Sequence, residues 1–171
     1  MLVTTKYNQT TITKKVSLSG VGLHTGKDVS ITFCPADADH GYSFKRIDLE
    51  GNPIIEADAS YVTSTERGTC LNKDDITIRT CEHVLASLVG LQIDNVLIEL
   101  NASEPPIMDG SSKFFVEALE EAGIKELSKK RKEFVIKNVI SYKDEDSGSE
   151  ITVIPSNEYQ VTTMVLSLIH I

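Results

Sequence analysis

Apolar residues change their spacing part-way along the chain, and this change constrains the fold more than any other feature of the sequence. Val29, Ile31 and Phe33 alternate with polar residues, which is typical of a strand with one buried face. After Thr80, the predicted N-cap, residues 80–90 instead carry apolar side chains at the spacing of one helix face. A chain that switches between these two periods is predicted to combine strands and helices in an α+β fold.

The other predicted elements follow the same two patterns. Strand-like segments lie at residues 11–18, 42–48, 69–78 and 93–100, and a second helix ends at Gly123. The order of strands, helix, strand and helix predicts an α+β layer in which both helices cover one face of a sheet. Two further strands, at 134–142 and 150–154, are predicted to be the first strands of a second sheet.

Charge and cysteine content narrow the classes of function. The 171 residues include 17 Lys and Arg against 25 Asp and Glu, a net charge of −8, and this field disfavours nucleic acid as a partner. The basic run at 129–132 is interpreted as a solvated connector, with a patch for anionic headgroups or phosphates as the alternative. Cys34, Cys70 and Cys81 form no CxxC pair, so we expect free thiols in the cytoplasm. No apolar run is long enough to form a transmembrane segment.

Three loops carry residues with both a structural and a functional interpretation. Segment 20–26 contains three glycines, and its His24 either bonds to backbone or lies at the rim of an active site. Segment 65–70 either faces a substrate or is a polar turn that enters a strand. Asp109 or Ser111 is the predicted N-cap of the second helix rather than a catalytic group.

Glu82 and His83 lie in the first turn of the first predicted helix. An acidic residue is stabilised there by unpaired N–H groups and by the helix dipole, so Glu82 has a purely structural explanation. In the functional alternative, His83 is a zinc ligand and Glu82 is a general base beside a metal-bound water. Spacing supplies no partner for His83, because Ala86 and Ser87 occupy the two positions where a helical ligand pair would need a second histidine.

Five blocks, in this order along the chain, resemble one bacterial enzyme family. They are SGVGLHTG at 19–26, TERGTCL at 65–71, TCEHVLASLVG at 80–90, IDN at 93–95 and PIMDGS at 106–111. Together they closely resemble the UDP-3-O-acyl-N-acetylglucosamine deacetylases.

This resemblance implies a zinc-dependent amide hydrolase that releases acetate from UDP-linked acylated N-acetylglucosamine, the committed step of lipid A biosynthesis. It implies two domains of layered β-α-α-β fold, similar to domain 2 of ribosomal protein S5, with the active site between them. Residue by residue, Glu82 is similar to the family's general base and His83 to one Zn²⁺ ligand. Leu23, His24, Gly68 and Asp109 fall in blocks that line or support the substrate site.

The resemblance also sets the expected domain boundaries. Residues 1–130 are expected to form the complete first domain, and 131–165 the opening strands of a truncated second domain that would supply the remaining His and Asp zinc ligands. This fragment alone is therefore expected to be inactive. Residues 166–171 match the translation of a transposon-library adaptor (CTG TCT CTT ATA CAC ATC), and we interpret them as a sequencing scar.

Three further possibilities remain open from the sequence. Some members of the family continue into a 3-hydroxyacyl-carrier-protein dehydratase, so the natural protein is either a single deacetylase or a bifunctional enzyme. A non-catalytic α+β binding module is a different class that fold alone allows. Transient contact with a membrane surface is compatible with a lipid-linked substrate.

Overall fold

The computed structural model describes residues 1–66 and 68–164. Contacts within the chain separate two compact units, one formed by Lys6–Arg131 and the other by Met1–Thr5 together with the segment that begins at Lys132. The predicted scar at 166–171 lies outside the described residues. No helix among the described residues has the length and apolar character needed to cross a membrane.

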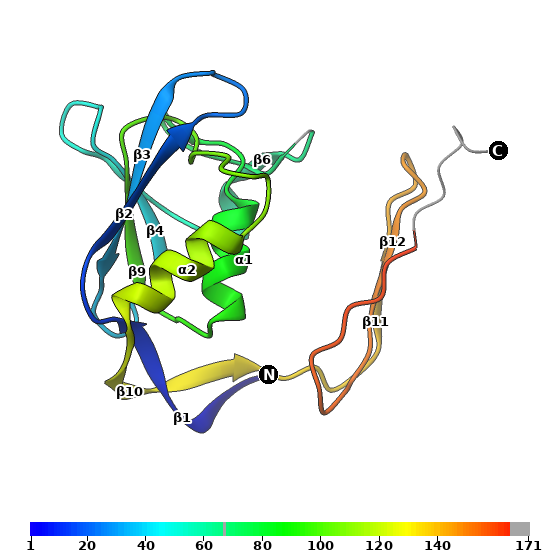
Figure 1. Cartoon of the computed structure of the whole chain (residues 1–171). Coiled ribbons are helices and arrows are strands. Elements are labelled where there is room, and N and C mark those ends of the chain that lie inside the picture. The colour runs from blue at the N-terminus through cyan, green and yellow to red at the C-terminus, as the bar shows by residue number, and fades with distance from the viewer. Residues whose placement is uncertain (67, 165–171) are drawn as a thin grey trace. The chain divides into compact units, whose positions relative to one another are not determined.

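A five-stranded sheet forms the centre of the Lys6–Arg131 unit (Figure 1). Its strands are, in spatial order, β2 (Val16–Val21), β3 (Asp28–Pro35), β9 (Val96–Leu100), β4 (Tyr42–Arg46) and β5 (Ile54–Glu56). Neighbours pair antiparallel except β4 and β9, which are parallel. The alternation read from the sequence is confirmed in β3, where Val29, Ile31 and Phe33 are buried.

Both helices lie on the same face of this sheet (Figure 1). They are α1 (Glu82–Gly90) and α2 (Lys113–Ala122). Each covers the sheet with an apolar stripe, and the Phe115 ring of α2 meets Phe33 of β3 edge-on with ring centroids 6.3 Å apart. The predicted α+β class and the two predicted helices are therefore confirmed.

A smaller three-stranded sheet precedes α1. It contains β6 (Val62–Ser64), β7 (Cys70–Lys73) and β8 (Ile76–Ile78), and the short 3₁₀ helix η1 (Ala59–Tyr61) leads into it. The single strand expected at 69–78 is in fact a hairpin, because Asp74 takes a positive φ of 53° and reverses the chain. This hairpin brings the chain to the start of α1.

The basic run at 129–132 is not the connector that the sequence suggested. It lies inside β10 (Ile124–Phe134), which pairs with β1 (Leu2–Ile12). Lys129 forms an ion pair with Asp39 at 2.6 Å, and Arg131 forms one with Asp94 at 2.9 Å. Acceptors far away in the sequence thus fix this run as a strand, which no local pattern could indicate.

The last two described strands, β11 (Ile140–Lys143) and β12 (Glu150–Val153), form an antiparallel hairpin. The strand predicted at 150–154 is confirmed. The one predicted at 134–142 is divided, since β10 ends at Phe134 and β11 begins only at Ile140.

Candidate functional site

Glu82 is the first residue of α1, so its predicted place in the first turn of a helix is confirmed. Its side chain is half-buried, and Oε2 accepts a hydrogen bond from the backbone N–H of Thr69 at 3.1 Å. This bond joins two of the sequence blocks, 65–71 and 80–90, at one point. One carboxylate oxygen is therefore fixed by the backbone of the neighbouring loop, while the other, Oε1, faces Gly68.

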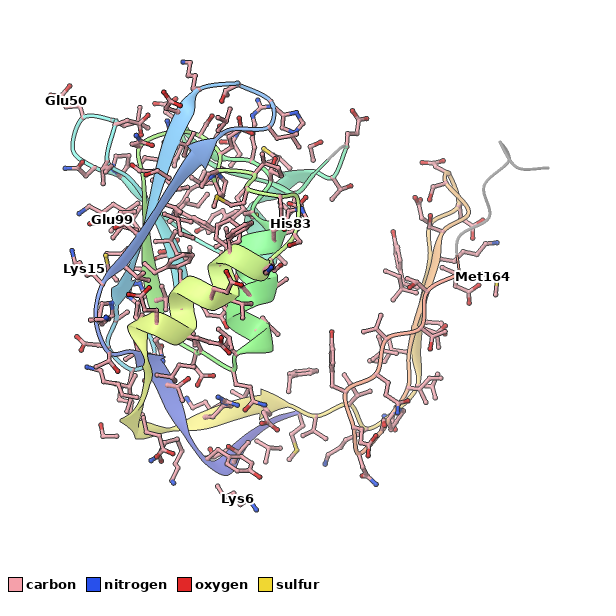
Figure 2. The ribbon with its side chains drawn as sticks, in the orientation of Figure 1. Lys6, Lys15, Glu50, His83, Glu99 and Met164 are labelled. Carbon is pink, nitrogen blue, oxygen red and sulfur yellow. The ribbon has the colours of Figure 1, made fainter. Side chains whose placement is uncertain are left out.

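His83 follows in the same turn and is also half-buried. Its backbone carbonyl accepts a hydrogen bond from Ser112 Oγ at 2.9 Å, which ties the first turn of α1 to the start of α2. Figure 2 shows His83 where these two helix ends meet. The backbone of His83 is thus tied to the residue that precedes α2.

Neither predicted N-cap is observed. The N-cap of α1 is Cys81, with no side-chain cap, and the preceding Thr80 takes a φ of 52°. The N-cap of α2 is Ser112, also without a side-chain cap. Ser111 nevertheless bonds to the start of α2, because its Oγ accepts a hydrogen bond from the backbone N–H of Lys113 at 3.2 Å.

Gly68 lies beside Glu82 in a conformation that requires glycine. Its φ is 144°, and a Cβ on it would meet Glu82 Oε1 at 3.3 Å and Thr80 Oγ1 at 3.4 Å. The missing side chain therefore leaves open the space that these two oxygens border.

A polar cavity of about 450 Å³ opens beside this point. Gly68 and Thr80 line it together with Thr63 and Ser64 of β6, which both carry hydroxyl groups. His24 also lines it and comes from segment 20–26, which we call the glycine loop. The structure thus brings His24 and Gly68 to one cavity.

The glycine loop is held by a residue that the sequence did not single out. Glu104 is fully buried, and its carboxylate accepts hydrogen bonds from the backbone N–H of Thr25 at 2.7 Å and of His24 at 3.2 Å. Burial raises the pKa of this carboxyl, but the bonds from Thr25 and His24 outweigh burial and hold the pKa below its usual range. Gly22 must lack a side chain here, because a Cβ would lie 2.4 Å from Glu104 Oε1.

The remaining predicted residues lie at the surface. Leu23, at the tip of the glycine loop, is 53% exposed. Asp109 is exposed and accepts hydrogen bonds from the N–H and Oγ of Ser111 at 3.0 and 2.8 Å, and these bonds lower its pKa. Asp109 therefore stabilises its own turn, and no described contact joins it to Glu82 or His83.

The described residues contain no group of three His, Cys, Asp or Glu side chains placed to hold a metal ion. His83 fits the role of a single ligand, since it is half-buried in the first turn of α1, directly after Glu82. A catalytic zinc site needs three protein ligands. The described part of the chain therefore does not form such a site by itself.

Comparison with known proteins identifies the family. The sequence model of the LpxC family, described as UDP-3-O-acyl N-acetylglycosamine deacetylase, matches residues 9–167. The chain belongs to this family. The resemblance carried by the five sequence blocks is thereby confirmed.

Relatives within the LpxC family differ in length and in domain content. The chain is 43% identical over 154 residues to the UDP-3-O-acyl-N-acetylglucosamine deacetylase of Geotalea uraniireducens, covering 90% of this chain and 50% of that protein. It is 45% identical over 157 residues to the bifunctional enzyme LpxC/FabZ of Bacteroides thetaiotaomicron, covering 92% of this chain and 34% of that protein. The chain thus spans half, or a third, of the length of these relatives.

Proposed function

We propose that the whole protein containing this chain is a zinc-dependent deacetylase, which hydrolyses the acetamide of UDP-3-O-acyl-N-acetylglucosamine and releases acetate in the committed step of lipid A biosynthesis. Family membership across residues 9–167 supports the reaction class. The observation that carries the proposal is the Glu82 carboxylate, held at one oxygen by Thr69 N–H and turned with the other toward the space over Gly68.

In this proposal Glu82 is the general base. It accepts a proton from water as the water oxygen bonds to the acetamide carbonyl carbon, and the proton passes to the nitrogen as the C–N bond breaks and acetate leaves. His83 supplies one of the ligands to Zn²⁺, and the remaining His and Asp ligands come from outside the described residues. When bound, the metal supplies Lewis acidity toward the water and the carbonyl.

We assign the neighbouring residues to substrate contact. His24 and Gly68 line the cavity beside Glu82, and the exposed side chain of Leu23 extends an apolar surface from the same loop. Asp109 is proposed to shape the turn that leads to Ser112 and so to His83. Together these positions would hold the sugar and its acyl chain against the base.

We also propose that residues 1–130 are the first deacetylase domain and 131–165 the start of the second. The division between Arg131 and Lys132 and the two helices on one sheet face support a layered β-α-α-β domain, similar to domain 2 of ribosomal protein S5. The three free cysteines support a cytoplasmic location. Contact with a membrane surface would be transient.

A bifunctional protein is the second candidate. The Bacteroides thetaiotaomicron relative and the Chlorobaculum tepidum relative, 42% identical over 158 residues, are both named bifunctional enzyme LpxC/FabZ. In that case the deacetylase part would be followed by a 3-hydroxyacyl-carrier-protein dehydratase. Reading the gene downstream of this segment decides between the two.

The deacetylase proposal is tested by measuring acetate release from the UDP-linked acylated sugar, using the protein with a complete second domain. We expect Glu82→Gln to lower kcat by at least about 100-fold, since the amide cannot accept the proton. Glu50→Gln is the matched control, because Glu50 is exposed on a distant turn, and it should retain full activity. Absence of acetate release by the wild-type protein would refute the proposal.

A further inference from the structure

Thr80 combines two unfavourable features at the edge of the candidate site. It is a β-branched residue with a φ of 52°, a left-handed conformation that such residues rarely adopt. Its side chain is also buried, with 6% of the residue exposed, and within the described residues Oγ1 has no hydrogen-bond partner. Both features cost free energy in the folded protein, and such features are concentrated at functional sites.

The Thr80 hydroxyl and the Glu82 carboxylate face the same small space. Both Thr80 Oγ1 and Glu82 Oε1 lie within 3.4 Å of the point that a Cβ of residue 68 would occupy, and they do not bond to each other. Glu82 Oε2 is occupied by the N–H of Thr69, so Oε1 is the oxygen left for a second partner. Because Gly68 has no side chain, both oxygens border the same side of its Cα with no Cβ between them.

The chemistry of the two oxygens selects what can bridge them. Thr80 Oγ1 has a proton to donate, whereas an ionised Glu82 can only accept. A carbonyl oxygen of the substrate could accept from Thr80 but has nothing to donate to Glu82. A water molecule does both at once.

We propose that Thr80 Oγ1 binds the water that Glu82 deprotonates, which makes Thr80 a further catalytic residue of this site. The inference rests on the proposed deacetylase function for the role of the water, although the water site itself does not depend on it. Thr80 donates to the water oxygen, the water donates to Glu82 Oε1, and a lone pair on the oxygen remains free to attack. A side chain at position 68 would crowd both oxygens, and Gly68 has none.

The water site is tested first in this chain without any substrate. A high-resolution crystal structure should show an ordered water within hydrogen-bond distance of Thr80 Oγ1 and Glu82 Oε1, and the Thr80→Val variant should lack it. Thr80→Val keeps the shape of the side chain and removes only the hydroxyl. A structure in which the wild-type Thr80 hydroxyl bonds to another protein group, or in which no water is present, would overturn the proposal.

The catalytic role is tested in the protein with a complete second domain. Thr80→Val should lower kcat by about 10- to 100-fold, with KM changed less than about twofold, because the hydroxyl acts on the water rather than on substrate binding. Thr80→Ser restores the hydroxyl and should remain within about threefold of wild type. Both variants should unfold at or above the wild-type temperature and bind the same amount of zinc, which separates a catalytic loss from a structural one.

The outcomes distinguish the catalytic role of Thr80 from the proposed deacetylase function. Full activity of Thr80→Val, in a preparation whose wild type releases acetate, would refute the role of Thr80 and leave the deacetylase intact. An inactive wild type refutes the proposed function instead, and the crystal structure still decides whether the water is bound.

Discussion

Single residues of the candidate site show where the sequence was informative. Glu82 and His83 could be placed in the first turn of a helix because the apolar spacing after residue 80 is local, and the structure confirms this position. Glu104 gave no such signal, because its importance comes from bonds to a loop distant in the sequence. Thr80 was predicted only as an N-cap, and its positive φ could not be read from the local pattern. In the sequence, Glu104 is simply an acidic residue between a serine and two prolines. Its role as an acceptor of backbone hydrogen bonds becomes visible only when the loop that contains His24 and Thr25 is placed beside it.

Glu104 offers the first prediction at this scale. Replacing it by Gln leaves the shape of the side chain but removes the charge that accepts the N–H groups of Thr25 and His24. We expect Glu104→Gln to lower the free energy of unfolding by about 1–3 kcal/mol at pH 7, measured by urea denaturation. Glu50→Gln, at an exposed site, should change it by less than about 0.5 kcal/mol.

The effect of Glu104 should also depend on pH in a defined direction. Its pKa in the folded protein lies below the usual range, so folding favours the ionised form. This contribution is fully present above the unfolded-state pKa of about 4.3 and is lost as the pH falls through the folded pKa. The stability difference between wild type and Glu104→Gln should therefore stay constant from pH 7 to about pH 5 and shrink below about pH 4.3. A difference that grows on acidification would contradict the assignment.

Secondary-structure elements were predictable where their pattern was local. The two helices and strands β3, β9 and β12 follow from apolar periodicity, and the structure confirms them. Strand β10 was missed because its run of charged residues is typical of a solvated linker. Its pairing with β1 and its ion pairs to distant residues show that it is a strand. The hairpin β7–β8 was read as one strand because the reversal depends on a single positive φ at Asp74.

The prediction for the secondary-structure elements concerns Arg131, which holds β10 in place. Its Nε and Nη2 atoms reach the two carboxylate oxygens of Asp94, both at 2.9 Å, and thereby fasten β10 beside the loop before β9. We expect Arg131→Lys to lose this two-point geometry and to speed amide hydrogen exchange in β1 and β10, with a loss of stability of about 1 kcal/mol. Lys132→Gln removes an exposed charge from the same strand and should leave exchange unchanged. Equal effects of the two variants would mean that the two-point geometry of the Arg131–Asp94 pair is not what holds the strand.

The whole molecule divides its apolar residues unequally. The buried core runs from Ile12 to Ala122, so it lies entirely within the Lys6–Arg131 unit. Every residue of β11 and β12 is exposed, including Ile140, Tyr142 and Ile151. A two-stranded hairpin is marginally stable by itself, and these apolar side chains are suited to packing against further structure, as a second domain would provide.

The prediction for the whole molecule concerns its affinity for zinc. Because the described residues contain no group of three metal-binding side chains, we expect the 171-residue chain to show no saturable zinc binding in the low micromolar range by calorimetry. In the protein with a complete second domain, zinc should bind tightly, and His83→Ala should weaken that binding by at least about 10- to 100-fold, because a missing ligand costs no less than a missing supporting hydrogen bond. His40→Ala is the matched control: the His40 imidazole, just before β4, bonds to Ser43 of that strand, so its loss should leave zinc affinity unchanged. Tight stoichiometric binding by the short chain, abolished by His83→Ala, would show instead that the first unit carries a metal site of its own.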